Sequence, residues 1–271
     1  NTTERLEHHE DAPSLKECLH LLATNRPLLM LFLGNVFFVI IKVSEQASFY
    51  FAYDALFNAK YNGFLDIAKA PGSFLAGIFV PIIIERLGRK ADSKKFYQAC
   101  CVMGIVLNGL FALCTYNGIM NKGAGQSVSL LTGLMVIVFS AVVTFPLEFK
   151  NLMQKEMEAE TVDYVEWKTG KRVEGTMLSI MSFTGKLEGT LSSFICLQVL
   201  ARTGYVEHTT DVSTLQNHST LLGLFLMTTV FPMVGYALML IPMHFYNITG
   251  DSHRRMIKDL SLIHISEPTR H

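Results

Sequence analysis

The feature that most constrains the fold of this chain is the gathering of its apolar residues into six long runs separated by charged connections. Half of the 271 residues are hydrophobic, although the formal net charge is +0. A run of about 20 apolar residues can cross a bilayer as a helix, which satisfies its own backbone hydrogen bonds in lipid. We therefore predict an all-α integral membrane protein. Its six transmembrane helices are expected at residues 27–57, 64–84, 96–116, 129–149, 177–200 and 221–246.

Basic residues alternate between the connections and so predict an orientation. One connection carries Arg86, Arg89, Lys90, Lys94 and Lys95, and the next but one carries Lys150, Lys155, Lys168, Lys171 and Arg172. The intervening connections hold single cations, namely Lys60, Lys122 and Arg202. Because Lys and Arg are enriched on the cytoplasmic side of membrane proteins, we expect both basic connections and both ends of the chain in the cytoplasm.

Several classes of function have no support in the sequence. The cysteines, Cys18, Cys100, Cys101, Cys114 and Cys196, have no paired spacing outside the apolar runs, which argues against a disulfide framework and a zinc site. No nucleotide-binding glycine loop or nucleophile elbow occurs. We predict no catalysis, no metal and no nucleic-acid partner, and the bilayer is the expected partner.

A dense polar block lies between the fourth and fifth apolar runs, and it reads Asp-Tyr-Val-Glu-Trp-Lys-Thr-Gly-Lys-Arg-Val-Glu-Gly over residues 163–175. A loop this charged cannot lie in hydrocarbon. The block resembles the loop between the tenth and eleventh helices of the glycoside-pentoside-hexuronide cation symporters. These form the melibiose-permease-like branch of the major facilitator superfamily. The resemblance extends from Ser14 to about Asp259 and implies helices seven to twelve of a twelve-helix fold.

This resemblance also implies the organisation of the chain. Residues 1–25 would be a cytoplasmic linker, residues 26–250 a six-helix transmembrane bundle, and residues 251–259 a cytoplasmic tail. Residues 260–271 look like the translation of a sequencing adapter, with an ordinary amphipathic tail as the alternative, and continuous genomic codons at this junction would contradict the adapter. The chain starts at Asn1 without a signal-peptide pattern, so we expect a fragment whose N-terminal six-helix half is its partner.

Lys186 is the leading candidate for a transport residue, because a charge near the bilayer centre needs a polar cavity or a partner. It lies fourteen positions after Arg172, about 21 Å along a helix, and Ser179 and Ser182 share its face. The segment 184–189 resembles the Lys-Leu-Gly or Lys-Gly-Gly segment of the family's eleventh helix, although Glu188 stands where glycine is usual, and the resemblance implies that Lys186 faces the central cavity. The alternative is a lysine that snorkels to the surface. Glu188, about 200° around the helix, either pairs with a cation on a neighbouring helix or marks a rotated or bent helix.

The first span carries a second candidate group, Lys42, Glu45 and Gln46, in which Lys42 and Glu45 can pair at three-residue spacing. This patch would line the cavity or, alternatively, hold only a structural pair. Asp66 and Lys69 have the same spacing in the second span, and we expect them to form a gate, an interface pair or a ligand site.

A third group is expected to act in conformational change. Residues 81–90 resemble the superfamily's cytoplasmic loop motif between helices eight and nine. With the polar block they would form a charge network that breaks and reforms as the two halves rock; a solvated surface loop is the alternative. The network residues are Asp163, Glu166, Lys168, Lys171, Arg172, Glu174, Arg86 and Arg89.

These observations favour a secondary active transporter that moves a glycoside, pentoside or hexuronide together with a cation by alternating access. The resemblance places the site of the coupling H+ or Na+, and much of the sugar site, in the N-terminal half, and it implies no other cofactor. A bacterial inner membrane is the expected location. The alternatives are a relative that carries a non-sugar or lipid-like solute, and a membrane scaffold or sensor that does not transport.

Overall fold

The computed structural model describes residues 14–87, 92–123, 125–170, 173–207 and 215–266, and helices account for nearly all of them. Within these ranges a short helix, α1 (Leu15–Thr24), precedes six long helices, and a last helix, α8 (Gly250–Ser266), follows them. The long helices are α2 (Arg26–Tyr50), α3 (Lys60–Leu87), α4 (Ser93–Met120), α5 (Leu130–Thr169), α6 (Glu174–Thr203) and α7 (His218–Phe245). A π-helical turn, η1 (Phe51–Ala55), continues α2.

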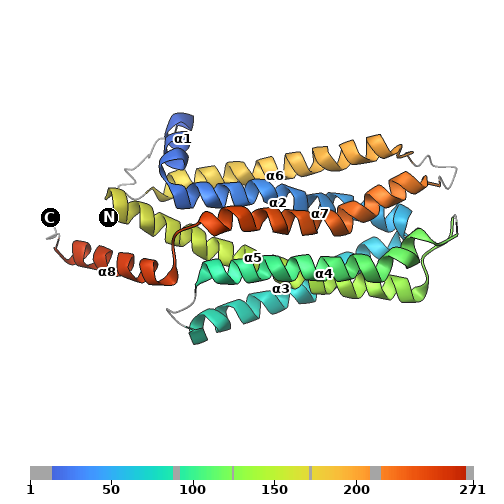
Figure 1. The fold of residues 1–271 in the computed structure, drawn as a ribbon, viewed down its shortest axis with the longest axis horizontal. Helices are drawn as coiled ribbons and strands as arrows, with labels where there is room; N and C mark the ends of the chain where they lie inside the picture. The colour runs from blue at the N-terminus through green and yellow to red at the C-terminus, as the bar shows by residue number, and fades with distance from the viewer. Residues whose placement is uncertain (1–13, 88–91, 124, 171–172, 208–214, 267–271) are drawn as a thin grey trace, which may run out of the picture.

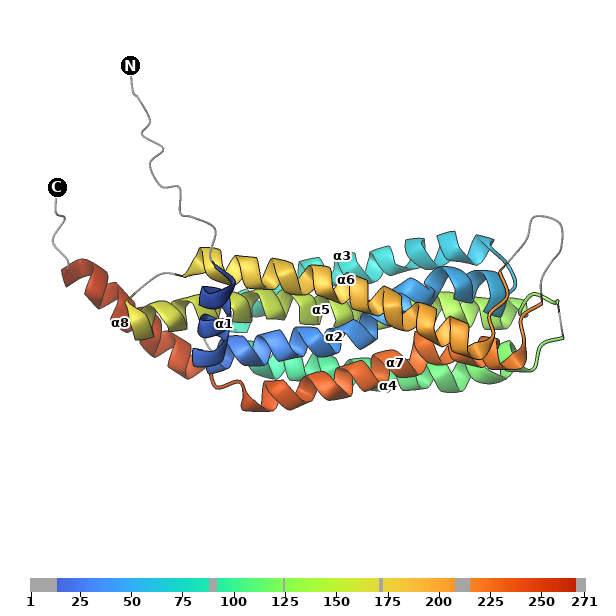
Figure 2. The same ribbon diagram turned by 90° about the horizontal axis from the view of Figure 1, so that it is seen from above.

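The six long helices lie lengthwise beside one another, and the chain runs up and down between the two ends of the bundle (Figure 1). Helix α5 packs against α3 and α4, helix α2 packs against α6 and α7, and the contact between α4 and α7 joins the two groups. Helices α1 and α8 lie at the same end of the bundle, as the view from above also shows (Figure 2). We call this the terminal end and the opposite one the far end.

The outer surface of the bundle is apolar. Large hydrophobic side chains are exposed along α3, α4, α5, α6 and α7, and Phe74, Leu113 and Leu130 are exposed by 69%, 77% and 77%. Helix α2 with η1, and helices α4, α5 and α7, are each long and apolar enough to cross a membrane. The chain is therefore a multi-pass membrane protein. Of the other long helices, α3 carries Asp66 and Lys69 and α6 carries Lys186 and Glu188.

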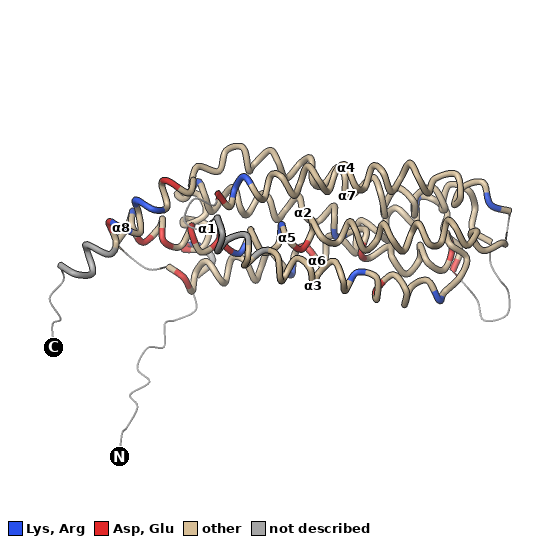
Figure 3. Tube along the Cα trace, turned by 90° about the horizontal axis from the view of Figure 1, so that it is seen from below, with Lys and Arg blue, Asp and Glu red and all other residues tan. Residues whose placement is uncertain are grey.

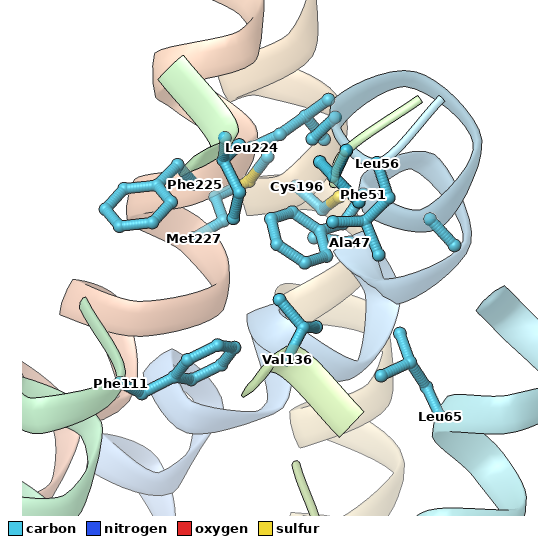
Figure 4. Close-up of a cluster of buried hydrophobic side chains, with 14 of the residues drawn as sticks. Ala47, Phe51, Leu56, Leu65, Phe111, Val136, Cys196, Leu224, Phe225 and Met227 are labelled. Carbon is cyan, nitrogen blue, oxygen red and sulfur yellow. The ribbon is translucent and has the colours of Figure 1, made fainter. Parts of the chain in front are cut away.

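Buried polar residues satisfy their hydrogen bonds largely within their own helices. The hydroxyls of Thr115, Thr144 and Thr184 each donate to the carbonyl oxygen four residues earlier at 2.7 Å. This bonding removes the cost of placing an unpaired hydroxyl in an apolar interior. Apolar clusters fill the space between the helices, and Figure 4 shows the cluster toward the far end, to which Phe51, Phe111 and Leu224 belong.

Charged positions are denser at the terminal end than along the rest of the bundle (Figure 3). The ends of α3 and α5 and the starts of α4 and α6 all lie there, so the two basic connections join helices at one end of the molecule.

Two sequence predictions about the fourth span are wrong. The predicted helix ended at residue 149 with a loop after it, whereas α5 continues to Thr169, and most of the polar block is helical. The 20 residues after Phe149 contain no Gly or Pro until Gly170, which ends the helix in the left-handed conformation at φ 67°. At about 1.5 Å per residue, α5 is about 60 Å long, twice the hydrocarbon thickness, so its polar half projects beyond the apolar half.

Candidate functional site

A cavity of about 280 Å³ opens among α2, α3, α4, α5 and α7. Its wall includes acidic, basic and hydroxyl side chains, among them Glu45, Ser48, Lys69, Ser140 and Glu148. Apolar side chains such as Phe51, Leu65 and Phe111 complete the wall. A mostly apolar cavity with a few converging polar groups is typical of a small-molecule site.

The two ion pairs that the spacing permitted are both present. Lys42 Nζ lies 2.9 Å from Glu45 Oε2, and Lys69 Nζ lies 3.0 Å from Asp66 Oδ1. Glu45 and Lys69 both line the cavity, so the structure brings the first two spans together here. Gln46 is exposed and does not belong to the described cavity wall.

Lys150 is fully buried, at 0% exposure, between helices. Its Nζ lies 3.8 Å from the centroid of the Phe38 ring on α2 and 5.8 Å from that of Tyr97 on α4. Lys150 was expected in a water-facing connection, and this prediction is wrong because α5 continues through the position and turns the side chain inward. A buried ammonium requires compensating partners.

Gln154 supplies one of these partners and ties α5 to α2. Lys150 Nζ donates to Gln154 Oε1 at 3.2 Å. The Gln154 amide in turn donates to Asn35 Oδ1 at 2.8 Å and to Glu158 Oε1 at 2.9 Å. One side-chain amide thus links a buried cation, a neighbouring helix and a carboxylate.

Glu188 on α6 supplies opposite charge. Its strongest charge interactions are with Lys150 and then with Lys42, both on other helices, and among the described residues it forms no ion pair within 4.0 Å with either lysine. Lys42 Nζ also lies 5.5 Å from the centroid of Phe38. We call Phe38, Lys42, Lys150, Gln154 and Glu188 the Lys150 cluster.

Lys186 lies on a different face of α6 from Glu188, as their spacing predicted. Lys186, Ser179 and Ser182 are all exposed. An added Cβ at Gly185 or Gly189 would meet no atom within 4 Å. This polar face of α6, with its small residues, is therefore open in the described chain.

The predicted charge network falls partly outside the described residues: Arg89, Lys171 and Arg172 lie there entirely, and so does the side chain of Arg86. Among its other members, Asp163 Oδ2 lies 3.0 Å from His253 Nε2 of α8. Lys168 Nζ lies over the Tyr164 ring at 5.8 Å, and Glu166 and Glu174 each interact with a neighbour. The contact of Asp163 therefore joins α5 to α8.

The end of α5 makes two further polar contacts. Glu160 accepts a hydrogen bond from Ser93 at 2.8 Å, and Trp167 Nε1 donates to Asp259 at 3.2 Å. In the part of the chain that the structure describes, no three His, Cys, Asp or Glu side chains gather in a way that could hold a metal ion.

Sequence reasoning missed Lys150, Gln154 and Asn35. The available signal was the four-residue spacing of Lys150, Gln154 and Glu158, which lie on one face of a continuous helix. The apolar run ended at Phe149, and the charged residues after it were assigned to solvent.

The family model and the curated relatives that match this chain all describe transport proteins. Residues 2–250 match the family model described as MFS/sugar transport protein. The chain is 26% identical over 239 residues to an uncharacterized symporter, YjmB, of Bacillus subtilis, which covers 88% of this chain and 47% of the relative.

Two other relatives have more specific descriptions. An isoprimeverose transporter of Lactiplantibacillus pentosus is 24% identical, over 98% of this chain and 51% of its own length. A glucuronide carrier protein homolog of Escherichia coli is 23% identical, over 92% of this chain and 50% of its own length. The chain thus spans about half the length of the curated relatives it matches.

Proposed function

Because this chain belongs to the MFS/sugar transport protein family, we propose that it forms the C-terminal six-helix half of a twelve-helix, cation-coupled sugar symporter. In this proposal α2 with η1, and α3 to α7, are helices seven to twelve and cross the membrane. The described helices support it, since all six have at least 25 residues, or about 37 Å, enough to cross the hydrocarbon core. The comparison also supports it, because the chain spans about half the length of its relatives.

The observation that carries this proposal is the open polar face of α6. Membrane helices pack through small residues that let backbones approach closely, and Gly185 and Gly189 have the spacing for such packing with open space before them. Lys186 lies between them and is exposed. An intramembrane ammonium facing lipid would be costly, so we propose that this face lines the central cavity opposite the N-terminal half.

In the proposed mechanism, the two halves rock about a site near the middle of the membrane, and binding of cation and sugar together favours the occluded state. H+ or Na+ would be the coupling ion, with its site mainly in the N-terminal half. Lys186, Ser182 and Ser179 would contact substrate or coupling carboxylates, and Lys42, Glu45 and Gln46 would lie toward the same pathway.

The remaining parts of the proposal concern placement. Residues 1–25 would be the cytoplasmic linker, residues 251–259 the cytoplasmic tail, and residues 260–271 foreign sequence. Helix α8 continues through the boundary between residues 259 and 260. The side chains from Ser261 on lie outside the described part of the chain. The terminal end would face the cytoplasm of a bacterial inner membrane, since the helices that the two basic connections join end and start there.

The test is solute uptake by the complete transporter in proteoliposomes, with an imposed Na+ or H+ gradient and a panel of neutral and acidic pyranosides. We expect gradient-driven accumulation of at least one sugar, and dissipating the gradient should abolish it. Accumulation of only non-sugar solutes would favour the non-sugar carrier, and absence of all transport would favour a scaffold or sensor.

A further inference from the structure

A second cavity, of about 170 Å³, lies at the far end of the bundle, away from the Lys150 cluster. Its wall joins η1 and the turn after it, the end of α4 with the connection that follows, and the start of α7. Asp54, Phe57, Lys122, Leu215 and His218 contribute to this wall. We call it the outer cavity.

The backbone beside the outer cavity has an unusual local structure. Asp54 lies in the π-helical turn η1, and such turns occur frequently at functional sites. Phe57, with φ 55°, is the only residue other than glycine with a positive φ in the described part of the chain. A bulky side chain in this region costs free energy, and the surrounding structure must hold it there. Ser127 does so in part, by donating a hydrogen bond to the Phe57 carbonyl oxygen at 3.0 Å.

Lys122 brings a polar group that needs a partner into this cavity. Its Nζ is buried, has no hydrogen-bond partner among the residues that the structure describes, and lies 5.4 Å from the centroid of the Phe57 ring. Burial lowers the pKa of Lys122 to about 8, while the charge of Asp54 acts in the opposite direction. An ammonium has three N–H donors, and leaving them unsatisfied in a buried position is costly, so the cavity favours an occupant with acceptor oxygens.

The other charged group of the wall limits the chemistry of that occupant. Asp54 is buried and accepts a hydrogen bond from the Tyr205 hydroxyl, whose pKa is raised by burial and by the Asp54 carboxylate. A free anion near Lys122 would be repelled by Asp54, and a free cation near Asp54 would be repelled by Lys122. A zwitterion would have to compete with Tyr205 for the carboxylate. Neutral hydroxyl groups both donate and accept, and therefore suit both residues.

We propose that the outer cavity binds a single neutral pyranose ring, with hydroxyl oxygens accepting from Lys122, a hydroxyl donating to Asp54, and the apolar ring face lying against Phe57. This inference rests on the proposed sugar transport for its choice of a sugar among hydroxyl-bearing solutes. It adds a binding site at the far end of the bundle, separate from the proposed central cavity.

Protection of an introduced cysteine tests the proposal. Leu215 lines the outer cavity and is 53% exposed, so Leu215→Cys in the complete transporter, purified in nanodiscs, should react with a maleimide. The modified peptide is quantified by mass spectrometry, which separates it from the native cysteines. D-glucose or D-xylose should slow alkylation at least threefold, whereas glycine, a small zwitterion, should not.

In the Leu215→Cys variant, adding Lys122→Met should remove this protection. Adding Lys60→Met instead should retain it, because Lys60 is an exposed lysine at the same end of the bundle. Circular dichroism and gel filtration of both variants check that they fold. If the Lys122→Met variant does not fold, Leu221→Trp, which fills the cavity, is used in its place and must also remove protection. Lack of protection by either sugar, equal protection by glycine, or protection that persists in the folded Lys122→Met or Leu221→Trp variant would overturn the proposal. Sugar uptake is measured separately. Protection that depends on Lys122 without uptake would therefore contradict the transport function and leave the binding site standing.

Discussion

The ammonium nitrogen of Lys150 lies 3.8 Å from the centre of the Phe38 ring, and that of Lys42 lies 5.5 Å from the same ring. One aromatic side chain of α2 thus contacts two cations, one from α5 and one from its own helix. Both distances are within the range of cation–π attraction. Two like charges remain this close because carboxylates compensate them: Glu45 pairs with Lys42, and Glu188 interacts with both lysines.

The charge balance of the Lys150 cluster gives the first prediction. Glu188→Gln removes a carboxylate from beside two partly or fully buried cations and should destabilise the fold by roughly 1–3 kcal/mol, since an uncompensated buried charge is costly. Adding Lys150→Met should restore most of the lost stability, because the double variant removes the unbalanced charge as well. Thermal unfolding in detergent measures both effects.

Glu156→Gln provides a matched control, because Glu156 is an exposed glutamate on α5. It should leave the unfolding temperature nearly unchanged. If the change in stability of the double variant equals the sum of the changes caused by Glu188→Gln and Lys150→Met alone, the two residues do not interact energetically.

A second prediction concerns the contact between α4 and α7. A Cβ at Gly104 would lie 2.5 Å from the Tyr236 ring, whereas a Cβ at Gly109 would meet only the flexible end of Met233 at 3.4 Å. Gly104→Ala should therefore destabilise by about 1–3 kcal/mol through overpacking. Gly109→Ala is the matched control and should be neutral or stabilising, because alanine favours a helix. Thermal unfolding of the two variants compares them directly, and equal unfolding temperatures would contradict the packing shown here.

Lys122 predicts a pH dependence of stability. Burial lowers its pKa in the folded protein from 10.5 to about 8, so between these values the unfolded chain binds a proton that the folded chain has lost. The wild type should therefore gain stability relative to Lys122→Met as pH rises from about 8 toward 10.5. The measurement is the difference between the two unfolding temperatures as a function of pH. A flat difference would show that the folded state does not depress this pKa.

Orientation can be tested by labelling intact cells. With the terminal end in the cytoplasm, Thr169→Cys should resist a membrane-impermeant maleimide, because this position lies at the end of α5 beside the basic connection. Leu215→Cys, at the far end, is the positive control and should react. The reverse pattern would mean that the bundle is inserted in the opposite orientation.

The positions of the helices were predictable from the sequence, and the inward position of Lys150 was not. Runs of apolar residues show where a chain can cross a membrane, and each of the six predicted spans overlaps one long helix. Hydropathy does not show where such a helix ends in water, so α5 extends 20 residues past the predicted end.

The local ion pairs were predictable because their residues are close in sequence, whereas the residues of the Lys150 cluster are far apart in sequence. Lys42 with Glu45 and Asp66 with Lys69 lie within one turn of a helix, so their spacing alone predicts contact. Lys150 lies against Phe38 of α2 and interacts with the charge of Glu188 of α6 only because the bundle brings residues of three helices near one another, and a single sequence contains no direct signal for that arrangement. The functional assignments of Lys186 and of the conformational network stay predictions.

Transport by the Lys186→Ala variant of the complete protein decides whether the open polar face of α6 lines the transport pathway. If Lys186 faces the central cavity and couples cation to sugar, its replacement should abolish gradient-driven accumulation while surface expression persists, since removing an intramembrane charge does not impede insertion. Lys186→Arg should rescue poorly, because a planar guanidinium is larger than an ammonium, and Lys95→Ala, at an exposed lysine of α4, should transport normally. Accumulation by Lys186→Ala at the wild-type level and equal surface expression would contradict the account.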